Sequence, residues 1–267
     1  MTRTTVNKRI SSLLKELRLT ALSESFEETT KHAEKSEMGH REYLLQLLEA
    51  ESFSRRNKQI GRYLRESKIP LEKSMETFDM KRLPLKTRRM IETLVDGDFL
   101  ALKENVLVFG NPGSGKTHLL CAIAHELIVR GHRVFFSSAN KLVEILLQAK
   151  RELKLEAAFR KYSRYEAVIL DDIGYVQYTR EEMEVLFCFL AQRYERGSVM
   201  LTSNLPFSGW EVIFKDPMTT AAAIDRLVHH SIILELNIES YRMAAAKKKK
   251  RSVLDENETA KNMGDLD

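Results

Sequence analysis

The stretch GNPGSGKT, residues 110–117, constrains the fold of this chain more than any other feature. It fits the pattern G-x-x-x-x-G-K-[S/T], in which glycines let backbone N–H groups turn inward around phosphate groups. An apolar run, Asn105–Phe109, precedes it, and an apolar-striped segment, Thr117–Arg130, follows it. Because the start of a helix adds partial positive charge to such a loop, the sequence predicts a strand–loop–helix unit that binds phosphate.

Short apolar runs alternate with helical patterns in the rest of this region. We expect further strands at Arg133–Ser137, Ala167–Leu170, Val199–Thr202 and Ile232–Leu236, with helices at about Lys141–Arg151, Leu155–Tyr162 and Glu181–Arg196. Continuous apolar strands separated by helices indicate a parallel sheet covered on both faces. The predicted fold class is therefore α/β, with a parallel sheet sandwiched by helices.

The N-terminal part of the chain has a different pattern, in which apolar residues recur at helical spacing, as in Leu13, Leu14 and Leu17. It predicts a small all-helical domain over residues 1–74, whose third helix, about Glu49–Ser67, is rich in arginine. A linker with two prolines follows. We expect the α/β core over residues 75–243 and a disordered charged tail over residues 244–267, which contains KKKKR.

Composition restricts the classes of protein that remain. The N-terminus lacks the apolar region of a secretory signal, and no uninterrupted apolar run approaches the ~20 residues that span a bilayer. The two cysteines cannot form a disulfide framework or a zinc-binding spacing. These features predict a cytoplasmic protein with no membrane partner. The net charge of +5 is compatible with a polyanionic partner, but also with a mildly basic nucleotide-binding enzyme.

The loop predicts ATP and Mg²⁺ as cofactors. Lys116 should reach the β- and γ-phosphates as a point charge, and the Thr117 hydroxyl should hold Mg²⁺. The candidate ATP-binding residues are Gly110, Asn111, Pro112, Gly113, Ser114, Gly115, Lys116, Thr117 and the adjacent His118.

Two further strand ends carry polar residues. The block AVILDDIG places Asp171 and Asp172 after an apolar strand, where Asp171 would hold Mg²⁺ and Asp172 would polarise the attacking water. Many related sites use Glu for the second role, so the shorter Asp172 suggests slow hydrolysis. An acidic pair can instead cap a helix. Asn204, at the end of the next strand, would contact the γ-phosphate or that water.

Phosphoryl transfer benefits from a guanidinium that neutralises charge on the γ-phosphate. Arg226, in AAIDRLVHH, and Arg242, in ESYRM, are the candidates. One could act from a neighbouring subunit and the other within the same chain, although isolated arginines are mostly surface residues.

With these motifs in hand, the chain resembles the AAA+ ATPases of the IstB/DnaC group and is especially similar to IstB, the transposition helper ATPase of insertion sequences. GNPGSGKTHL, ILDDIGY, LTSNLPFSGW, DRLVHHS and ESYR carry the resemblance. It implies that Asn204 is sensor 1, that Arg226 is an arginine finger acting in trans, and that Arg242 is at the sensor 2 position. Phe78, in the linker, is the implied contact to adenine.

The resemblance also implies partners: duplex DNA, bound largely without sequence preference, a cognate transposase, and further copies of the chain in an ATP-dependent homo-oligomer. Lys150, Arg151, Lys154, Arg160 and Lys161 are the implied DNA contacts. They would bind phosphates in a salt-sensitive way, or they form a solvated helix face. The helix Glu49–Ser67 is a second candidate DNA surface.

The sequence thus favours a DNA-binding AAA+ ATPase that assembles on target DNA and recruits or stimulates a transposase. A replicative helicase loader of the DnaC type would share the same core and differ in its client. A small-molecule kinase would use the loop differently, under an arginine-rich lid, which the sequence does not suggest.

Overall fold

A computed structural model describes residues 3–174, 178–214 and 216–241. The chain forms two compact units, residues 1–62 and 63–267, which divide within helix α3 (His40–Ser67). Helix α3 therefore contributes residues to both units. The domain bounds taken from the sequence remain a prediction, and the tail expected over residues 244–267 lies outside the described residues.

The first unit consists of α1 (Arg3–Glu16), α2 (Thr20–Lys35) and the N-terminal part of α3. Its small core is formed by Leu14, Leu22 and Leu47. The residue before α2 is Leu19, whose side chain cannot accept a hydrogen bond, so the helix start needs an acceptor from elsewhere. Glu51 of α3 provides it, because its carboxylate accepts the Leu22 backbone N–H at 3.0 Å. The expected all-helical segment is thus present.

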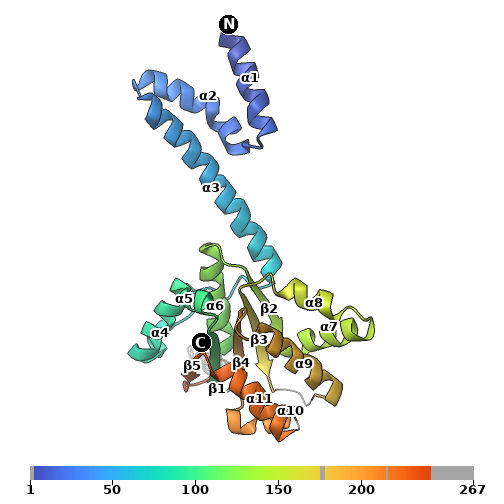
Figure 1. The fold of residues 1–267 in the computed structure, drawn as a ribbon. Helices are drawn as coiled ribbons and strands as arrows, with labels where there is room; N and C mark the ends of the chain where they lie inside the picture. The colour runs from blue at the N-terminus through green and yellow to red at the C-terminus, as the bar shows by residue number, and fades with distance from the viewer. Residues whose placement is uncertain (1–2, 175–177, 215, 242–267) are drawn as a thin grey trace, which may run out of the picture. The chain divides into compact units, whose positions relative to one another are not determined.

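The second unit is built around a five-stranded sheet (Figure 1). The strands are β1 (Asn105–Gly110), β2 (Val134–Ser138), β3 (Ala167–Ile173), β4 (Ser198–Ser203) and β5 (Ser231–Leu236). Their order is β2-β3-β4-β1-β5, and every pairing is parallel. In the central strands β1, β3 and β4 the first four residues are all buried, as the apolar runs predict. All five predicted strands are confirmed within a few residues.

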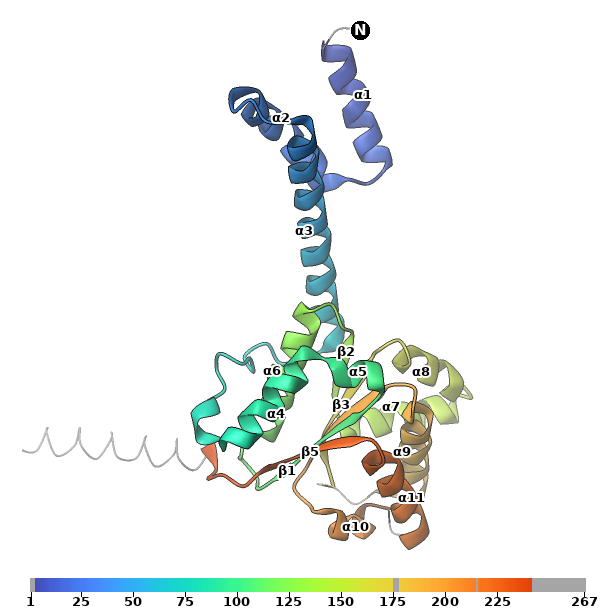
Figure 2. The ribbon, with the colours of Figure 1, turned by 60° about the vertical axis from the view of Figure 1, so that its left-hand side comes forward.

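Helices cover both faces of the sheet, as Figures 1 and 2 both show. One side carries α4 (Leu85–Asp96), α5 (Asp98–Leu102) and α6 (Lys116–Val129), and the other carries α7 (Ala139–Arg151), α8 (Leu155–Tyr162), α9 (Arg180–Arg193) and α11 (Pro217–Val228). The short elements η1 (Met80–Arg82), η2 (Phe207–Gly209) and α10 (Glu211–Phe214) complete the unit. The sandwiched parallel sheet predicted from the sequence is confirmed.

Helix α9 ends at Arg193, earlier than the predicted Arg196, because the backbone leaves the helical conformation at Tyr194, whose ψ angle is 126°. The Arg193 side chain is 5% exposed, and its guanidinium donates to the carbonyls of Tyr162, Tyr165, Glu166 and Ser198. Burial lowers the pKa of Arg193 to about 10. A Cβ atom at Gly197 would lie 2.4 Å from Arg193 Nη2, so only glycine leaves room there. Arg193 thereby ties the end of α9 to the starts of β3 and β4.

Among the described residues, no helix is both long enough and apolar enough to cross a membrane.

Candidate nucleotide-binding site

The loop GNPGSGKT joins β1 to α6, as its sequence predicts. Gly113 and Gly115 have φ angles of 80° and 95°, in the left-handed region that favours glycine. A Cβ atom at Gly115 would also lie 3.2 Å from Cε2 of Phe78, so the linker packs directly on the loop. The hydroxyl of Ser114 is buried and has no hydrogen-bond partner among the described residues. The loop therefore has the backbone shape of a phosphate cradle.

Lys116 is the first residue of α6 and is only 4% exposed. Its ammonium group donates to the carbonyl oxygens of Gly110, at 2.8 Å, and Asn111, at 3.1 Å. These hydrogen bonds hold the Lys116 ammonium group next to the backbone at the start of the loop. A buried ammonium beside helix-start N–H groups is suited to bind an anion.

Asp171 and Thr117 meet where β3 ends beside α6. The Thr117 hydroxyl donates to Asp171 Oδ1 at 2.7 Å, and the Thr202 hydroxyl donates to the same oxygen at 2.7 Å. Burial raises the pKa of Asp171, and the two hydroxyl groups oppose this by stabilising the carboxylate. A carboxylate and a hydroxyl are hard oxygen ligands, so this pair fits Mg²⁺.

The backbone turns sharply at Asp172. Its φ angle is 58°, and the register between β3 and β4 shifts between Leu170 and Ile173. The Asp172 N–H donates to the Thr202 hydroxyl at 2.7 Å, which supports this unusual conformation. As a result Asp171 is partly buried while Asp172 is exposed in the same cavity. Thr202 was not a predicted site residue, although its position at the end of the strand next to β3 was visible in the sequence.

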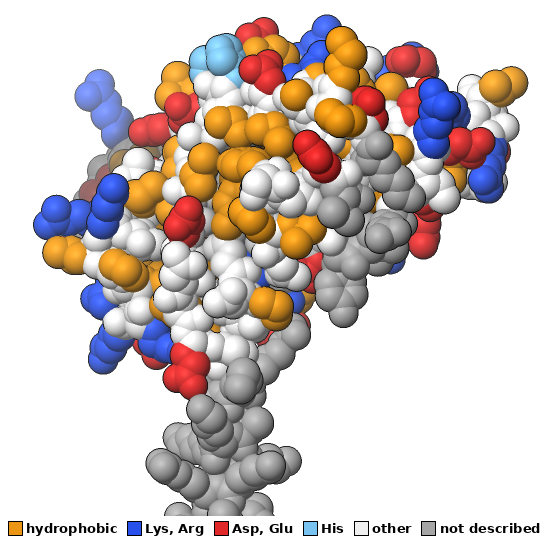
Figure 3. Space-filling view, turned by 90° about the horizontal axis from the view of Figure 1, so that it is seen from below, with side chains coloured by type: hydrophobic (Ala, Val, Ile, Leu, Met, Phe, Trp, Pro, Cys, Tyr) orange, Lys and Arg blue, Asp and Glu red, His pale blue; other side chains and the backbone are white. Residues whose placement is uncertain are grey.

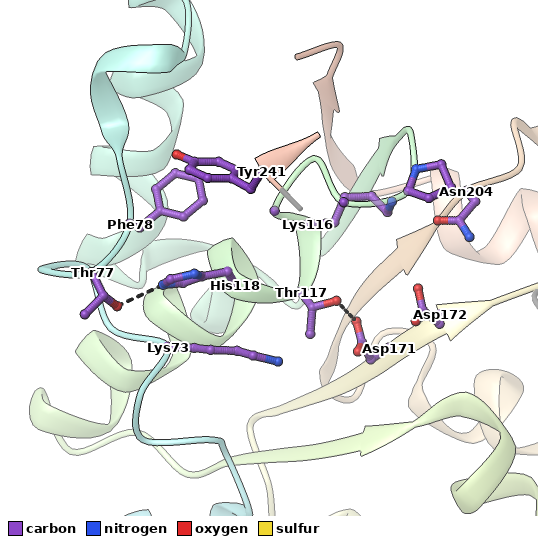
Figure 4. A pocket seen from close by; sticks show the side chains of 13 residues that line it. Lys73, Thr77, Phe78, Lys116, Thr117, His118, Asp171, Asp172, Asn204 and Tyr241 are labelled. Atoms are coloured by element: carbon purple, nitrogen blue, oxygen red, sulfur yellow. Dashed lines mark hydrogen bonds between the residues drawn. The ribbon is translucent and has the colours of Figure 1, made fainter. Parts of the chain in front are cut away.

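These groups line a cavity of about 370 Å³, which we call the P-loop cavity (Figure 4). Its volume is typical of a small-molecule site. The lining residues are Lys73, Thr77, Phe78, Pro112, Gly113, Gly115, Lys116, Thr117, His118, Asp171, Asp172, Asn204 and Tyr241. The cavity thus gathers the loop after β1, the end of β3 and the residue after β4, at the C-terminal ends of three strands, as expected for ligand sites in parallel sheets.

Aromatic side chains lie at one end of the cavity. Phe78 is buried and contacts the His118 ring edge-on, with centroids 5.3 Å apart. Tyr241 donates its backbone N–H to the Gly113 carbonyl at 2.9 Å, and the Arg82 guanidinium is 3.9 Å above the Tyr241 ring. Apolar rings beside a phosphate loop suit an aromatic base. Sequence reasoning missed Tyr241, although it is next to Arg242 in the ESYR motif.

Several predicted residues lie elsewhere. Gly110, Asn111 and Ser114 belong to the loop but do not line the cavity. Arg226 does not line it either: this side chain donates to the Ala222 carbonyl at 2.9 Å and is 4.8 Å from the Phe187 ring centroid. Arg242 lies outside the described residues.

The five predicted DNA contacts lie on or beside α7 and α8, away from the cavity. Three of them have acidic neighbours: Lys150 pairs with Glu184 at 2.9 Å, Arg151 with Glu181 at 3.7 Å and Lys154 with Glu152 at 3.0 Å. Arg160 and Lys161 are exposed in the last turn of α8. The structure thus presents these cations at the surface, and DNA contact stays a prediction.

The order of the strands decides the class of protein. With the loop-bearing strand β1 between β4 and β5, and with polar residues after β3 and β4, the second unit has the AAA+ form of the P-loop fold. A solved structure of the DnaC helicase loader has the same fold, with a TM-score of 0.54 and 16% identity over 67% of this chain and 99% of that one.

The chain belongs to the family of IstB-like ATP binding proteins, whose family model matches residues 12–252. It is 39% identical to an insertion sequence ATP-binding protein of Sinorhizobium fredii, over 91% of this chain and 82% of that relative. It is 37% identical to the ATP-binding protein of insertion sequence IS21 from Pseudomonas aeruginosa, over 92% of each chain. The family predicted from the sequence motifs is thereby confirmed.

Proposed function

We propose that the protein binds Mg-ATP in the P-loop cavity and hydrolyses it. The observation that carries this proposal is the hydrogen bond between Thr117 and Asp171 at the mouth of the phosphate cradle, because it brings a hydroxyl and a carboxylate together where a metal would be needed. The loop N–H groups and Lys116 would hold the phosphates. Thr117 and Asp171 would hold Mg²⁺, which neutralises phosphate charge when bound.

Hydrolysis needs a group that orients water toward the γ-phosphate. Asp172 and Asn204 both line the cavity beside Asp171, from the ends of β3 and β4. In the proposed reaction, the Asp172 carboxylate accepts a hydrogen bond from the attacking water. The Asn204 amide contacts the γ-phosphate or that water. Phe78 and Tyr241 would contact the adenine base.

Calorimetry of Mg-ATP binding to the whole protein tests this proposal. We expect saturable heat with the wild type and none with Lys116→Ala, because the substitution removes the buried ammonium from the cradle. Lys81→Ala, which removes an exposed lysine outside the cavity, is the control and should bind like the wild type. Equal affinity of Lys116→Ala and wild type would contradict the proposed site.

We further propose that the ATPase acts in insertion-sequence transposition, on DNA and with a transposase. The insertion-sequence ATP-binding proteins named above support this, since they match nearly the whole chain. The likeness to the DnaC helicase loader supports an alternative client, a replicative helicase, but it extends to the fold alone. Co-purification of the full-length chain with a transposase, compared with a helicase, distinguishes the two. Retention of the helicase alone would favour the loader.

DNA binding is proposed for the basic residues of α7, α8 and the turn between them. Phosphates would have to displace the acidic neighbours of Lys150, Arg151 and Lys154, which are surface pairs and therefore weak. Fluorescence anisotropy with duplex DNA at several salt concentrations measures the number of phosphate contacts. Replacing these three residues by Ala should lower the slope of log affinity against log salt by up to about 3. An unchanged slope would place the DNA surface elsewhere.

A homo-oligomer is proposed because Arg226 does not line the cavity of its own chain. Figure 3 shows hydrophobic side chains gathered near the middle of the face seen from below, where α10 and α11 lie in Figure 1. Met218 of α11 is 83% exposed. An apolar face on a charged protein is typical of a surface that meets another chain, which supports assembly.

A further inference from the structure

Lys73 lies in the linker after α3, a segment that the sequence analysis did not connect with catalysis. It lines the P-loop cavity together with Thr117, Asp171 and Asp172. Figure 4 shows its side chain extended from the linker toward Thr117 and Asp171. Lys73 therefore brings a second ammonium group to the cavity, in addition to Lys116, and brings it to the side where the carboxylates lie.

The backbone around Lys73 is held in place by local contacts. The Thr77 hydroxyl accepts the Ser74 N–H at 3.1 Å and donates to the Glu72 carbonyl at 2.9 Å, which closes a turn around Lys73. The ring of His118, on α6, lies 3.0 Å from the Thr77 hydroxyl and 3.2 Å from the Ser74 carbonyl. The linker is thus attached to α6 through His118, at two residues that follow Lys73, and this fixes the backbone from which the Lys73 side chain extends.

The electrostatic surroundings agree with this placement. The positive charge of Lys73 opposes the effect of burial on the pKa of Asp171. Cys121 lies one turn after Thr117 in α6, and burial raises the pKa of its thiol to about 12. The positive charge of Lys73 opposes this rise as well. Both effects agree with Figure 4, in which the Lys73 side chain points toward Thr117 and Asp171, the residues that would hold Mg²⁺.

Asp171 has negative charge available on this side. Both hydroxyl donors, Thr117 and Thr202, bind its Oδ1, so Oδ2 receives neither hydrogen bond. Asp172 adds a second carboxylate, and Lys116 is engaged with loop carbonyls. Two adjacent carboxylates repel an incoming triphosphate unless cations balance them. Lys73 is the cation placed to do so.

We propose that Lys73 is a positioning residue that balances Asp171 before Mg²⁺ arrives and competes with Mg²⁺ for that carboxylate. A metal held by Thr117 and Asp171 would repel the Lys73 ammonium and would favour positions of that side chain nearer the phosphates. Since Lys73 is in the linker, metal binding and linker position are coupled. This inference rests on the proposed Mg-ATP site and adds a residue and a regulatory role to it.

Binding of a fluorescent ATP analogue to the full-length protein, in EDTA and over a range of Mg²⁺ concentrations, tests the inference. In EDTA, Lys73→Met should bind the nucleotide about tenfold more weakly than wild type, the size of one lost charged contact. The Mg²⁺ concentration that gives half-maximal binding should fall several-fold, because the metal no longer competes with an ammonium. Lys73→Arg keeps the positive charge, so its nucleotide affinity in EDTA and its half-maximal Mg²⁺ concentration should both be close to those of the wild type.

Lys86→Met is the matched control, since it removes an exposed lysine of α4 that does not line the cavity. Thermal melting checks that each variant is folded, and Lys73→Gln provides a second variant. If the wild type binds nucleotide and Lys73→Met and Lys73→Gln behave like Lys86→Met at every Mg²⁺ concentration, this inference is wrong and the proposed function stands. If the wild type binds no nucleotide with Mg²⁺, the proposed function fails and this inference fails with it.

Discussion

At the scale of single residues, Asp171, the proposed metal ligand, is a carboxylate held in a partly buried position. Its carboxylate is withdrawn from water at the end of β3, and burial raises its pKa. Hydrogen bonds from Thr117 and Thr202 recover part of the lost solvation. The charged form of Asp171 is therefore expected to stabilise the fold less by itself than it would with a cation bound to it. Such a conflict is common at functional sites.

This conflict gives a pH-dependent prediction for Asp171→Asn. A raised pKa in the folded state means that Asp171 contributes most to stability below its ordinary pKa of 3.8 and that this contribution is lost as the pH rises. Asparagine keeps the acceptor oxygen and carries no charge. We therefore expect the variant to melt a few degrees higher than wild type at pH 7.5 without Mg²⁺, with the difference vanishing near pH 3.8.

Differential scanning calorimetry without nucleotide measures these melting temperatures. Asp96→Asn, at an exposed position at the end of α4, is the control and should show little change. If Asp171→Asn melts at or below the wild-type temperature at pH 7.5, the charged carboxylate stabilises the fold even without a metal, and this prediction is wrong.

At the scale of elements, Arg193 connects the end of α9 to the N-terminal ends of β3 and β4. A buried guanidinium with no acidic partner described beside it is unusual, yet four backbone carbonyls surround it. These carbonyls come from the segment before β3 and from the start of β4. The Tyr162 and Glu166 carbonyls also accept backbone N–H groups, from Tyr165 and Ser198, so the guanidinium adds a second donor to each. The side chain therefore adds to the backbone hydrogen bonds in this region and joins α8, the segment before β3 and the start of β4.

Replacing this arginine tests its role. Arg193→Met keeps an unbranched side chain but removes every donor, so we expect the free energy of unfolding to fall by roughly 3 kcal/mol. Urea denaturation followed by circular dichroism measures the loss. Arg196→Met, three residues later and in an exposed position, should change it by less than about 0.5 kcal/mol. Similar small losses for both variants would show that water satisfies the carbonyls equally well.

Elements and local motifs could be predicted from the sequence because their signals are local. Apolar runs of strand length predicted β1 and β3, and the loop pattern predicted where α6 begins. Lys73 and Tyr241 could not be found in this way. Each reaches the cavity by packing against residues far away in the chain, and neither belongs to a motif with a fixed spacing to the loop. The early end of α9 was also missed, since it coincides with buried hydrogen bonds of Arg193 to other elements, which a local apolar pattern does not reveal.

At the scale of the whole molecule, the position of Arg226 is the feature with the widest consequence. It is half-buried on α11, bound to its own helix and stacked near Phe187, and it does not line the P-loop cavity. A guanidinium that is to neutralise the γ-phosphate must come within contact distance of it. In an assembly of identical chains, Arg226 of one subunit would meet the cavity of the next. ATP hydrolysis would then depend on assembly.

Mixing two inactive variants tests this arrangement. Arg226→Ala should bind ATP but complete no neighbouring site, and Asp172→Asn should bind ATP but hydrolyse it slowly. In an equal mixture, roughly a quarter of the interfaces combine an intact Asp172 with an intact Arg226 from the adjacent chain, if subunits mix at random. We expect ATPase activity, measured as phosphate release, to recover to about that fraction of the wild-type rate. No recovery at any mixing ratio would contradict a role for Arg226 in trans.

The attachment of Tyr241 to Gly113 also bears on how the protein is made. Ribosomes synthesise the chain from its N-terminus, so the phosphate loop emerges long before β5, the neighbour of β1, and before the tyrosine whose N–H holds the loop. Until those residues have left the exit tunnel, the site is incomplete. We therefore expect ATP to bind the proposed site fully only after β5 and Tyr241 have been synthesised.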